Sequence, residues 1–260
     1  MSSRQARIAA ARGRIAALER GSAPARGVLA FGDARVDGCL PGGGLGLGHW
    51  HEFAGEGLEI ETAASVAAFV ALLAGRLSDG ASGSGELVWV LRRDDLHAPG
   101  LAGLGFPAER LIQVCARDEA EALGVLEDAL RTKGVAAAIG EVDLVDLTAG
   151  RRLQLACEQG GGTGFVLRRR PFGGGQRRDP AGSAAATRWR IAAAPSQPAP
   201  DEPGLGAPRW NVGLERCRGG RTGRWLMEAW EEDHAAHPLR VVAELGDRDL
   251  APQEPVRLAG

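Results

Sequence analysis

Residues 40–62, LPGGGLGLGHWHEFAGEGLEIET, combine an apolar strand pattern at 50–54 with a glycine turn and the start of a helix. The turn contains Gly55 and Gly57, and an Ala/Val/Leu-rich helix pattern follows over about 59–77. A strand, a glycine turn and a helix in this order are typical of the phosphate-binding loop of nucleotide-binding α/β domains. We therefore expect an α/β domain built around this segment.

The turn lacks the residues that would hold a phosphate. In the pattern GxxxxGK[ST], the second glycine lets backbone N–H groups converge, and the lysine reaches the β- and γ-phosphates. Counting from Gly55, Ile60 stands at the second glycine position and Glu61 at the lysine position, so that only Thr62 matches. A carboxylate would repel a triphosphate, whereas it stabilises the first turn of a helix. The degenerate nucleotide position, Gly55, Gly57, Ile60, Glu61 and Thr62, is therefore predicted to be an inactive scaffold turn.

Composition limits the class of protein. The 260 residues are 44% hydrophobic, which is enough for a full core. The four cysteines show no CxxC spacing, so neither a zinc cluster nor a disulfide framework is indicated. His49 and His51 flank Trp50, and we interpret them as packing or capping residues. The chain shows no signal peptide and no apolar run long enough to cross a membrane. We expect a cytoplasmic protein without metal, other cofactor or membrane contact.

The middle of the chain alternates short apolar runs with amphipathic segments. Strands alternating with helices at this spacing indicate a mostly parallel sheet with helices on both faces. The predicted strands cover 87–91, 111–115, 135–139 and 164–167, and the predicted helices cover 118–132 and 147–159.

After residue 167 the pattern changes. Residues 168–186, RRRPFGGGQRRDPAGSAAA, form an Arg/Gly/Pro-rich loop, and three alternating segments follow at 187–193, 210–217 and 224–230. Arg218-Gly219-Gly220-Arg221 is a hairpin signal. These segments are predicted to extend the sheet with antiparallel strands. The predicted domains are an N-terminal helix (1–26), an α/β domain (27–230) and a C-terminal tail (231–260) with an apolar patch at 239–245.

Several separate blocks resemble one known family. They are LPGGGLGLGHWHEFAG (40–55), GFPAERLIQVCARDEAEAL (105–123), VAAAIGEVDLVDLTAGRRLQLA (135–156), TRWRIAAAPS (187–196) and PGLGAPRWNVGLERCRGG (203–220). In this order they are similar to the ImuA family, RecA-like proteins of a bacterial mutagenesis cassette, over residues 1–230. RecA itself is a more distant relative. The resemblance implies a RecA-like twisted sheet.

The resemblance also implies which residues would occupy the sites of a RecA-like ATPase. Glu141 stands at the strand end that carries a magnesium-linked aspartate, and Arg93 stands near the position of the catalytic glutamate. Phosphoryl transfer depends on the parts that are replaced here, so we predict no catalytic residues and no enzyme activity. The arginine-rich loop corresponds to a DNA-contacting loop of RecA. Candidate contacts to single-stranded DNA phosphates are Arg168, Arg169, Arg170, Arg177 and Arg178.

The implied function is that of a non-catalytic accessory factor in SOS-induced, error-prone translesion DNA synthesis. Its implied partners are an ImuB-type Y-family polymerase-like protein and an error-prone C-family DNA polymerase, with RecA and single-stranded DNA as further candidates. Two alternatives stay open: a weakly ATP-binding, RecA-like recombination protein, and a SulA-type cell-division inhibitor. The first helix and the tail carry apolar residues outside the α/β core, so they are the predicted partner surfaces.

Overall fold

The computed structural model describes residues 27–78, 85–169, 183–198, 204–230 and 237–246. The helix predicted at 1–26 and residues 170–182 of the arginine-rich loop lie outside this part of the chain. Within it, one sheet of nine strands organises the fold. The strands are β3 (Trp50–Gly55), β4 (Glu86–Leu91), β5 (Leu111–Cys115), β6 (Val135–Val142), β7 (Thr163–Arg168), β8 (Thr187–Ala194), β9 (Arg209–Cys217), β10 (Gly223–Ala229) and β11 (Leu239–Glu244).

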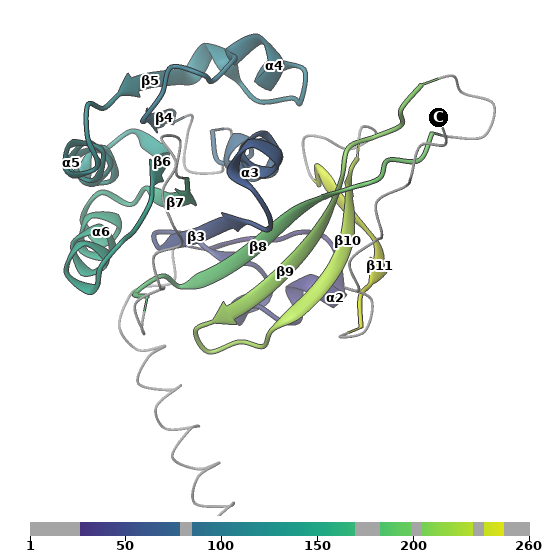
Figure 1. Ribbon diagram of the computed structural model, residues 1–260. Coiled ribbons are helices and arrows are strands. Elements are labelled where there is room, and N and C mark those ends of the chain that lie inside the picture. Colours follow the sequence, from purple (N-terminus) through teal and green to yellow (C-terminus); the bar gives the residue numbers. More distant parts are fainter. Residues whose placement is uncertain (1–26, 79–84, 170–182, 199–203, 231–236, 247–260) are drawn as a thin grey trace, which may run out of the picture.

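The sheet has the strand order β11-β10-β9-β8-β3-β7-β6-β4-β5. Strands β8, β3, β7, β6, β4 and β5 run parallel to one another, whereas β9, β10 and β11 are added by antiparallel pairing. The mostly parallel sheet with C-terminal antiparallel strands that the sequence predicted is thus confirmed (Figure 1). Central parallel strands are covered on both faces, which explains why β4 and β6 read as nearly continuous apolar runs.

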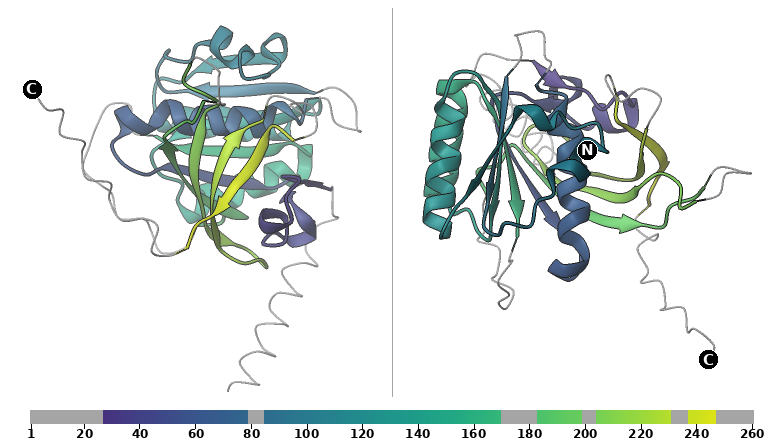
Figure 2. Two further views of the ribbon diagram at one scale, coloured as in Figure 1. Left: turned by 90° about the vertical axis from the view of Figure 1, so that its right-hand side faces the viewer. Right: turned by 90° about the horizontal axis from the view of Figure 1, so that it is seen from above.

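Helices cover both faces of the parallel part, as predicted (Figures 1 and 2). Helix α3 (Glu59–Gly75) lies on one face, and α5 (Glu119–Arg131) and α6 (Leu147–Gly160) lie side by side on the other. Helices α5 and α6 follow aspartate N-caps, Asp118 and Asp146, whose carboxylates accept backbone N–H groups at 2.8 and 2.7 Å. Such caps satisfy N–H groups that have no partner inside the helix, which fixes where each helix begins.

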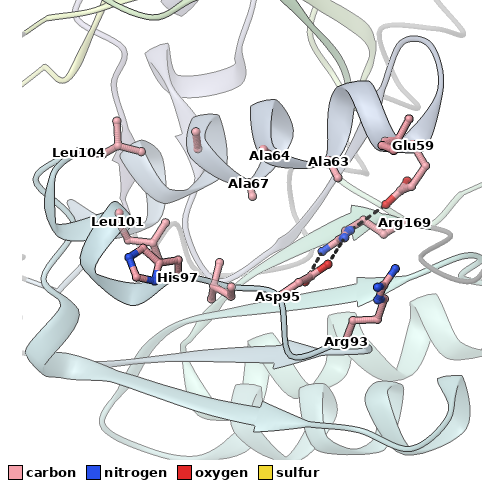
Figure 3. A pocket seen from close by; sticks show the side chains of 14 residues that line it. Glu59, Ala63, Ala64, Ala67, Arg93, Asp95, His97, Leu101, Leu104 and Arg169 are labelled. Carbon is pink, nitrogen blue, oxygen red and sulfur yellow. Dashed lines mark hydrogen bonds and ion pairs between the residues drawn. The ribbon is translucent and has the colours of Figure 1, made fainter.

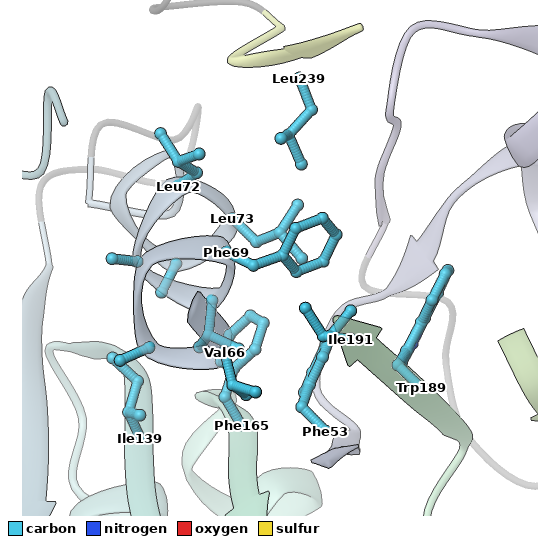
Figure 4. Packing of buried hydrophobic residues seen from close by; sticks show 14 of the residues in the cluster. Phe53, Val66, Phe69, Leu72, Leu73, Ile139, Phe165, Trp189, Ile191 and Leu239 are labelled. Atoms are coloured by element: carbon cyan, nitrogen blue, oxygen red, sulfur yellow. The ribbon is translucent and has the colours of Figure 1, made fainter. Parts of the chain in front are cut away.

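The larger core lies between α3 and the sheet (Figure 4). Phe53 of β3 stacks on Phe165 and Trp189 of the two neighbouring strands, with ring centroids 5.9 and 6.1 Å apart. Phe69 of α3 contacts Trp210 edge to face at 5.7 Å. Aromatic side chains bury large apolar areas, so this cluster fixes α3 against the junction of the parallel and antiparallel strands.

The sheet continues past residue 230, where the sequence prediction ended the domain. Strand β11 pairs antiparallel with β10, and its Leu239 is buried. Glu228 of β10 forms one ion pair with Arg209, at 2.7 Å, and another with Arg240 of β11. Residues 239–244 alternate between buried or half-buried and exposed positions, which is the pattern of a strand with one covered face. We therefore propose that the α/β domain extends to β11.

Smaller elements complete the described part. Strands β1 (Val28–Leu29) and β2 (Leu45–Gly46) form a separate antiparallel pair near the short helix α2 (Ala34–Asp37). Helix α4 (Ala98–Ala102) follows β4. Among the helices of the described residues, none combines the length and the hydropathy that a membrane crossing requires.

Candidate functional site: an ion-paired cluster at the degenerate nucleotide position

The turn between β3 and α3 uses its own backbone groups to begin the helix. The N–H groups of Glu61 and Thr62 both donate to the carbonyl oxygen of Leu58, at 3.0 and 3.1 Å, and the Thr62 hydroxyl donates to the same oxygen at 3.0 Å. A phosphate-binding loop must keep such N–H groups free to converge on the ligand. Here they are already satisfied, and Thr62 is buried. The turn therefore has the outline of a phosphate loop, but the N–H groups of Glu61 and Thr62 and the Thr62 hydroxyl are occupied within the chain.

The glycines of the turn have a packing reason to be present. A Cβ atom on Gly55 would lie 2.3 Å from the Thr62 hydroxyl oxygen, which is too close for two non-bonded atoms. Gly57 has a φ of +121°, a backbone conformation that other residues rarely adopt. Both glycines are thus required to connect β3 tightly to α3, whether or not a ligand binds.

Next to the turn, the guanidinium group of Arg169 contacts three carboxylates, two of which, Glu59 and Asp95, are drawn in Figure 3. Arg169 follows the end of β7, and its side chain is only 10% exposed. It donates to Glu59 at 2.8 Å and to Glu141 at 2.8 Å, and it makes a two-pronged contact with Asp95 at 3.0 and 3.3 Å. Glu59 begins α3, Asp95 follows β4 and Glu141 lies in β6, so the cluster ties together four elements that are distant in the sequence.

Charge compensation explains why the cluster can be buried. Glu141 is completely buried, and burial raises its pKa above the ordinary value for a glutamate, although the charge of Arg169 and a 3.2 Å bond from the Trp89 indole act in the opposite direction. Burial alone would lower the pKa of Arg169, but its hydrogen bonds to Asp95, Glu59 and Glu141 and the charge of Glu141 give a net increase. The guanidinium thus remains charged and acts as the fixed counter-ion of the three carboxylates.

A cleft of about 660 Å³ opens beside the cluster. Its walls are one side of α3 and the segment that follows β4 (Figure 3). Most of its surface is apolar, including Ile60, which is 91% exposed, and Arg93 lies at the edge near Asp95. The remaining lining comes largely from small or apolar side chains: Ala63, Ala64, Ala67, Ala68, Leu96, Leu101 and Leu104. A nucleoside triphosphate entering here would meet Glu59 and Asp95 beside Arg93 and Arg169, so these charged groups give the cleft no excess of positive charge.

The arginine-rich loop is tied to the domain at both ends. Arg168 forms a 2.9 Å ion pair with the buried Glu52, and Arg188 lies 3.3 Å from the same carboxylate. The hydroxyl of Ser183, where the described chain resumes, donates to Glu52 at 2.8 Å. Both guanidinium groups thus make internal ion pairs, and contact of Arg168 and Arg169 with DNA phosphates stays a prediction. Arg170, Arg177 and Arg178 lie outside the described residues.

The two histidines occupy different environments. His49 precedes β3, and one of its ring nitrogens lies 2.9 Å from the side-chain amide of Gln154. His51 is completely buried, with Nδ1 2.8 Å from the Thr187 hydroxyl and Nε2 2.9 Å from the Gly46 carbonyl oxygen. A carbonyl oxygen can only accept, so Nε2 carries the proton and Nδ1 accepts from the hydroxyl. No group of three or more possible ligands that could hold a metal ion occurs in the described residues.

The sequence predicts Glu141 only as part of a degenerate nucleotide position, and it does not predict the ion pairs that Glu59 and Asp95 make with Arg169. Glu59 stands in the first turn of α3, and Asp95 follows β4 in a segment rich in turns. A signal was present, because arginines directly follow the central strand β7 while carboxylates stand at or near the same edge of its neighbours. Carboxyl ends of parallel strands meet at one edge of a sheet, so these charges were placed to meet.

Comparison with known proteins gives close relatives and a distant structural neighbour. No family model matches the chain. It is 59% identical over 246 residues to the protein named "Protein ImuA" from two strains of Caulobacter vibrioides, NA1000 / CB15N and ATCC 19089 / CIP 103742 / CB 15. The alignments cover 94% of this chain and 100% of each relative. Among solved structures, SulA from Pseudomonas aeruginosa aligns with 21% identity and a TM-score of 0.40, over 46% of this chain and 98% of SulA.

Proposed function

The chain belongs to the ImuA family, and from this premise we propose that it is a non-catalytic accessory factor in SOS-induced, error-prone translesion DNA synthesis. In this proposal the α/β domain serves as a scaffold for other proteins and does not turn over a nucleotide. The relatives align over their whole length, so the proposal concerns the entire family architecture rather than a shared fragment.

The contacts of Arg169 are the observation that carries the non-catalytic part of the proposal. A nucleotide hydrolase needs a lysine and a metal ion at the phosphates and a base near the attacking water. In this chain, Glu61 replaces the lysine and Arg169 supplies the positive charge between Glu59 and Glu141. These two carboxylates are thus hydrogen-bonded to a guanidinium group of the chain itself.

The proposed partners are an ImuB-type Y-family polymerase-like protein and an error-prone C-family DNA polymerase, with RecA as a further candidate. Family membership supports a role beside such proteins. The exposed apolar side chains of Leu58 and Ile60, 65% and 91% exposed, offer one surface that a partner could cover. The N-terminal helix (1–26) and the tail (231–260), which includes β11, remain partner surfaces proposed from the sequence.

Direct contact with single-stranded DNA is the last part of the proposal. Since Arg168 and Arg169 make internal ion pairs, it rests on the remaining loop arginines at 170, 177 and 178 and on the basic composition of this region. Residues 165–225 contain twelve arginines and four acidic residues, an excess of eight positive charges.

A genetic complementation experiment tests whether function requires nucleotide chemistry. The readout is the frequency of damage-induced mutations in a strain that lacks the chain and is supplied with wild type or with Thr62→Val. This substitution keeps the buried shape of Thr62 and removes its hydroxyl, the group that matches the phosphate-loop pattern. We expect equal restoration of mutagenesis by both. Loss of mutagenesis with a normally folded Thr62→Val protein would favour the weakly ATP-binding alternative.

Three biochemical measurements complete the test. Titration with a fluorescent ATP analogue and Mg²⁺ should show no saturable binding, and ATP turnover should equal a protein-free blank. Capture of the ImuB-type partner by the purified chain should succeed without nucleotide. Filamentation of cells that overproduce the chain, with mutation frequency unchanged by its deletion, would instead identify a division inhibitor.

A further inference from the structure

The two margins of the sheet differ in how they are protected (Figure 1). Strand β11 forms one margin, and its sequence LRVVAE carries Arg240 and Glu244. Its pairing with β10 also contains a register shift between Leu226 and Met227. Charged residues and irregular register are the usual means by which an edge strand avoids pairing with another chain. This margin therefore has protection of its own.

Strand β5 forms the other margin and has none of these features. Its sequence LIQVC contains no charge, proline or glycine, and its pairing with β4 is regular along all five residues. Ile112 is 47% exposed, and Gln113 and Cys115 are also exposed. Among the described residues, β5 has a strand neighbour on one side only. A regular, uncharged and apolar edge of this kind is a template for a further strand.

The backbone of β5 fixes which residues can accept such a strand. The N–H group of Ala116 donates to the Leu91 carbonyl of β4 at 2.8 Å. Backbone groups alternate in direction along a strand, so Val114 and Ile112 also point toward β4, while Leu111, Gln113 and Cys115 direct their N–H and C=O groups outward. The outward groups are thus arranged symmetrically about Gln113.

The side chains of β5 and the charged residues beside it indicate which strand could pair with this edge. In antiparallel self-pairing centred on Gln113, Leu111 lies opposite Cys115 and Ile112 lies opposite Val114. Beyond the strands, Glu109 in the 3-10 turn before β5 would approach Arg117 of the other copy, whose guanidinium also pairs with Glu121 at 3.0 Å, and both Glu109 and Arg117 are exposed. The arrangement uses all three outward-facing residues and forms about six backbone hydrogen bonds. Its apolar pairs and its charges are therefore complementary to a second copy of the same edge.

We propose that β5 is a self-association edge, through which two copies of the chain form a symmetric dimer with a continuous sheet. The two-fold axis passes beside Gln113. Since residues that oppose each other in antiparallel strands share one face, helix α5 of both copies lies on the same side of the joined sheets. The surface is separate from the Arg169 cluster and does not depend on nucleotide or DNA.

Sedimentation velocity of the full chain under reducing conditions, over a range of concentrations, tests the proposal. Reduction excludes dimers linked through the exposed Cys115. We expect a concentration-dependent dimer for wild type. Ile112→Lys should raise the dimer dissociation constant about tenfold or more, because it places two ammonium groups in the new interface. Leu205→Lys, which changes an 84% exposed leucine in the same chemical way elsewhere, should leave the dissociation constant unchanged.

Two further variants test the register. Gln113→Pro removes an outward N–H group without removing a bond to β4, so it should prevent dimerisation while the thermal unfolding transition is kept. Glu109→Arg alone should weaken the dimer, and adding Arg117→Glu should restore it by reversing both charges. A monomer at every concentration would overturn the proposal. So would a dimer that Ile112→Lys and Gln113→Pro leave intact, or one that Leu205→Lys weakens equally.

Discussion

Arg169 and Glu141 form a buried ion pair, with 2.8 Å between Nη1 and Oε2. The pair joins the end of β7 to the neighbouring strand β6. Glu59 and Asp95 complete the shell of carboxylates around the guanidinium. Because one guanidinium group holds all three carboxylates, we expect the stability of the domain to depend on Arg169.

Replacing Arg169 should therefore destabilise the protein. Breaking a buried pair by removing one partner typically costs about 3–5 kcal/mol, because the other charge is left buried and uncompensated. We expect Arg169→Met to lower the free energy of unfolding by an amount in this range, measured by urea denaturation. Arg151→Met, at an exposed position on α6, should change it by less than about 0.5 kcal/mol.

A second substitution separates the loss of charge from the loss of packing. Adding Glu141→Gln to Arg169→Met removes the carboxylate that is left without its partner, so the double variant should recover part of the lost stability. If the double variant loses the sum of the two single effects, Arg169 and Glu141 are not coupled in the way that their geometry indicates.

The sequence predicted the architecture well because it depends on patterns that are local. Apolar runs such as 87–91 and 111–115, and the aspartates before α5 and α6, mark strands and helix starts without knowledge of the rest of the chain. Contacts between distant segments were harder to predict. The partners of Arg169 come from α3, the segment after β4 and β6, and nothing within residues 168–178 distinguishes a buried arginine from one that faces solvent.

His51 should make the stability of the domain depend on pH. Burial lowers its pKa from 6.5 to about 3, so the native state keeps it neutral in a range where the unfolded state binds a proton. Above pH 6.5, His51 is neutral in both states and does not lower the free energy of unfolding. As the pH is lowered from 6.5 toward 3, protonation of the unfolded state lowers this free energy by up to about 1.4 kcal/mol per pH unit.

The variant His51→Gln isolates this contribution. Glutamine can still donate to Gly46 and accept from Thr187, but it does not titrate. We expect the variant to be less stable than wild type at pH 7, with the two unfolding free energies converging between pH 6 and pH 4. Parallel curves over this range would show that His51 is protonated in the native state or that another group dominates.

The position of β11 predicts how far the C-terminus can be shortened. Deleting residues 231–260 removes β11 together with the buried Leu239 and the ion pair between Arg240 and Glu228. We expect a loss of about 2 kcal/mol or more, the contribution of one buried leucine, in thermal or urea unfolding. Deleting residues 247–260 keeps every described strand and should leave the unfolding midpoint unchanged. Equal stability of both truncated proteins would mean that β11 contributes little to the domain.

The arginine-rich loop gives the last prediction, since two of its five arginines now have internal partners. Each arginine that neutralises a phosphate releases counter-ions, so affinity for single-stranded DNA should fall with salt by a logarithmic slope of about 0.7 per contact. Changing Arg170, Arg177 and Arg178 to alanine should therefore weaken binding and reduce that slope by about two, with no loss of stability. Fluorescence anisotropy with a labelled oligonucleotide at several salt concentrations measures both quantities.

A matched variant removes three exposed cations elsewhere: Lys133, Arg151 and Arg152. It has the same net charge, so it should keep the wild-type slope. If both triple variants reduce the slope equally, the affinity for DNA depends only on the net charge of the protein, and a specific contact by the loop is excluded. If neither variant alters it, the loop does not bind DNA, and any DNA contact must come from the proposed polymerase partners.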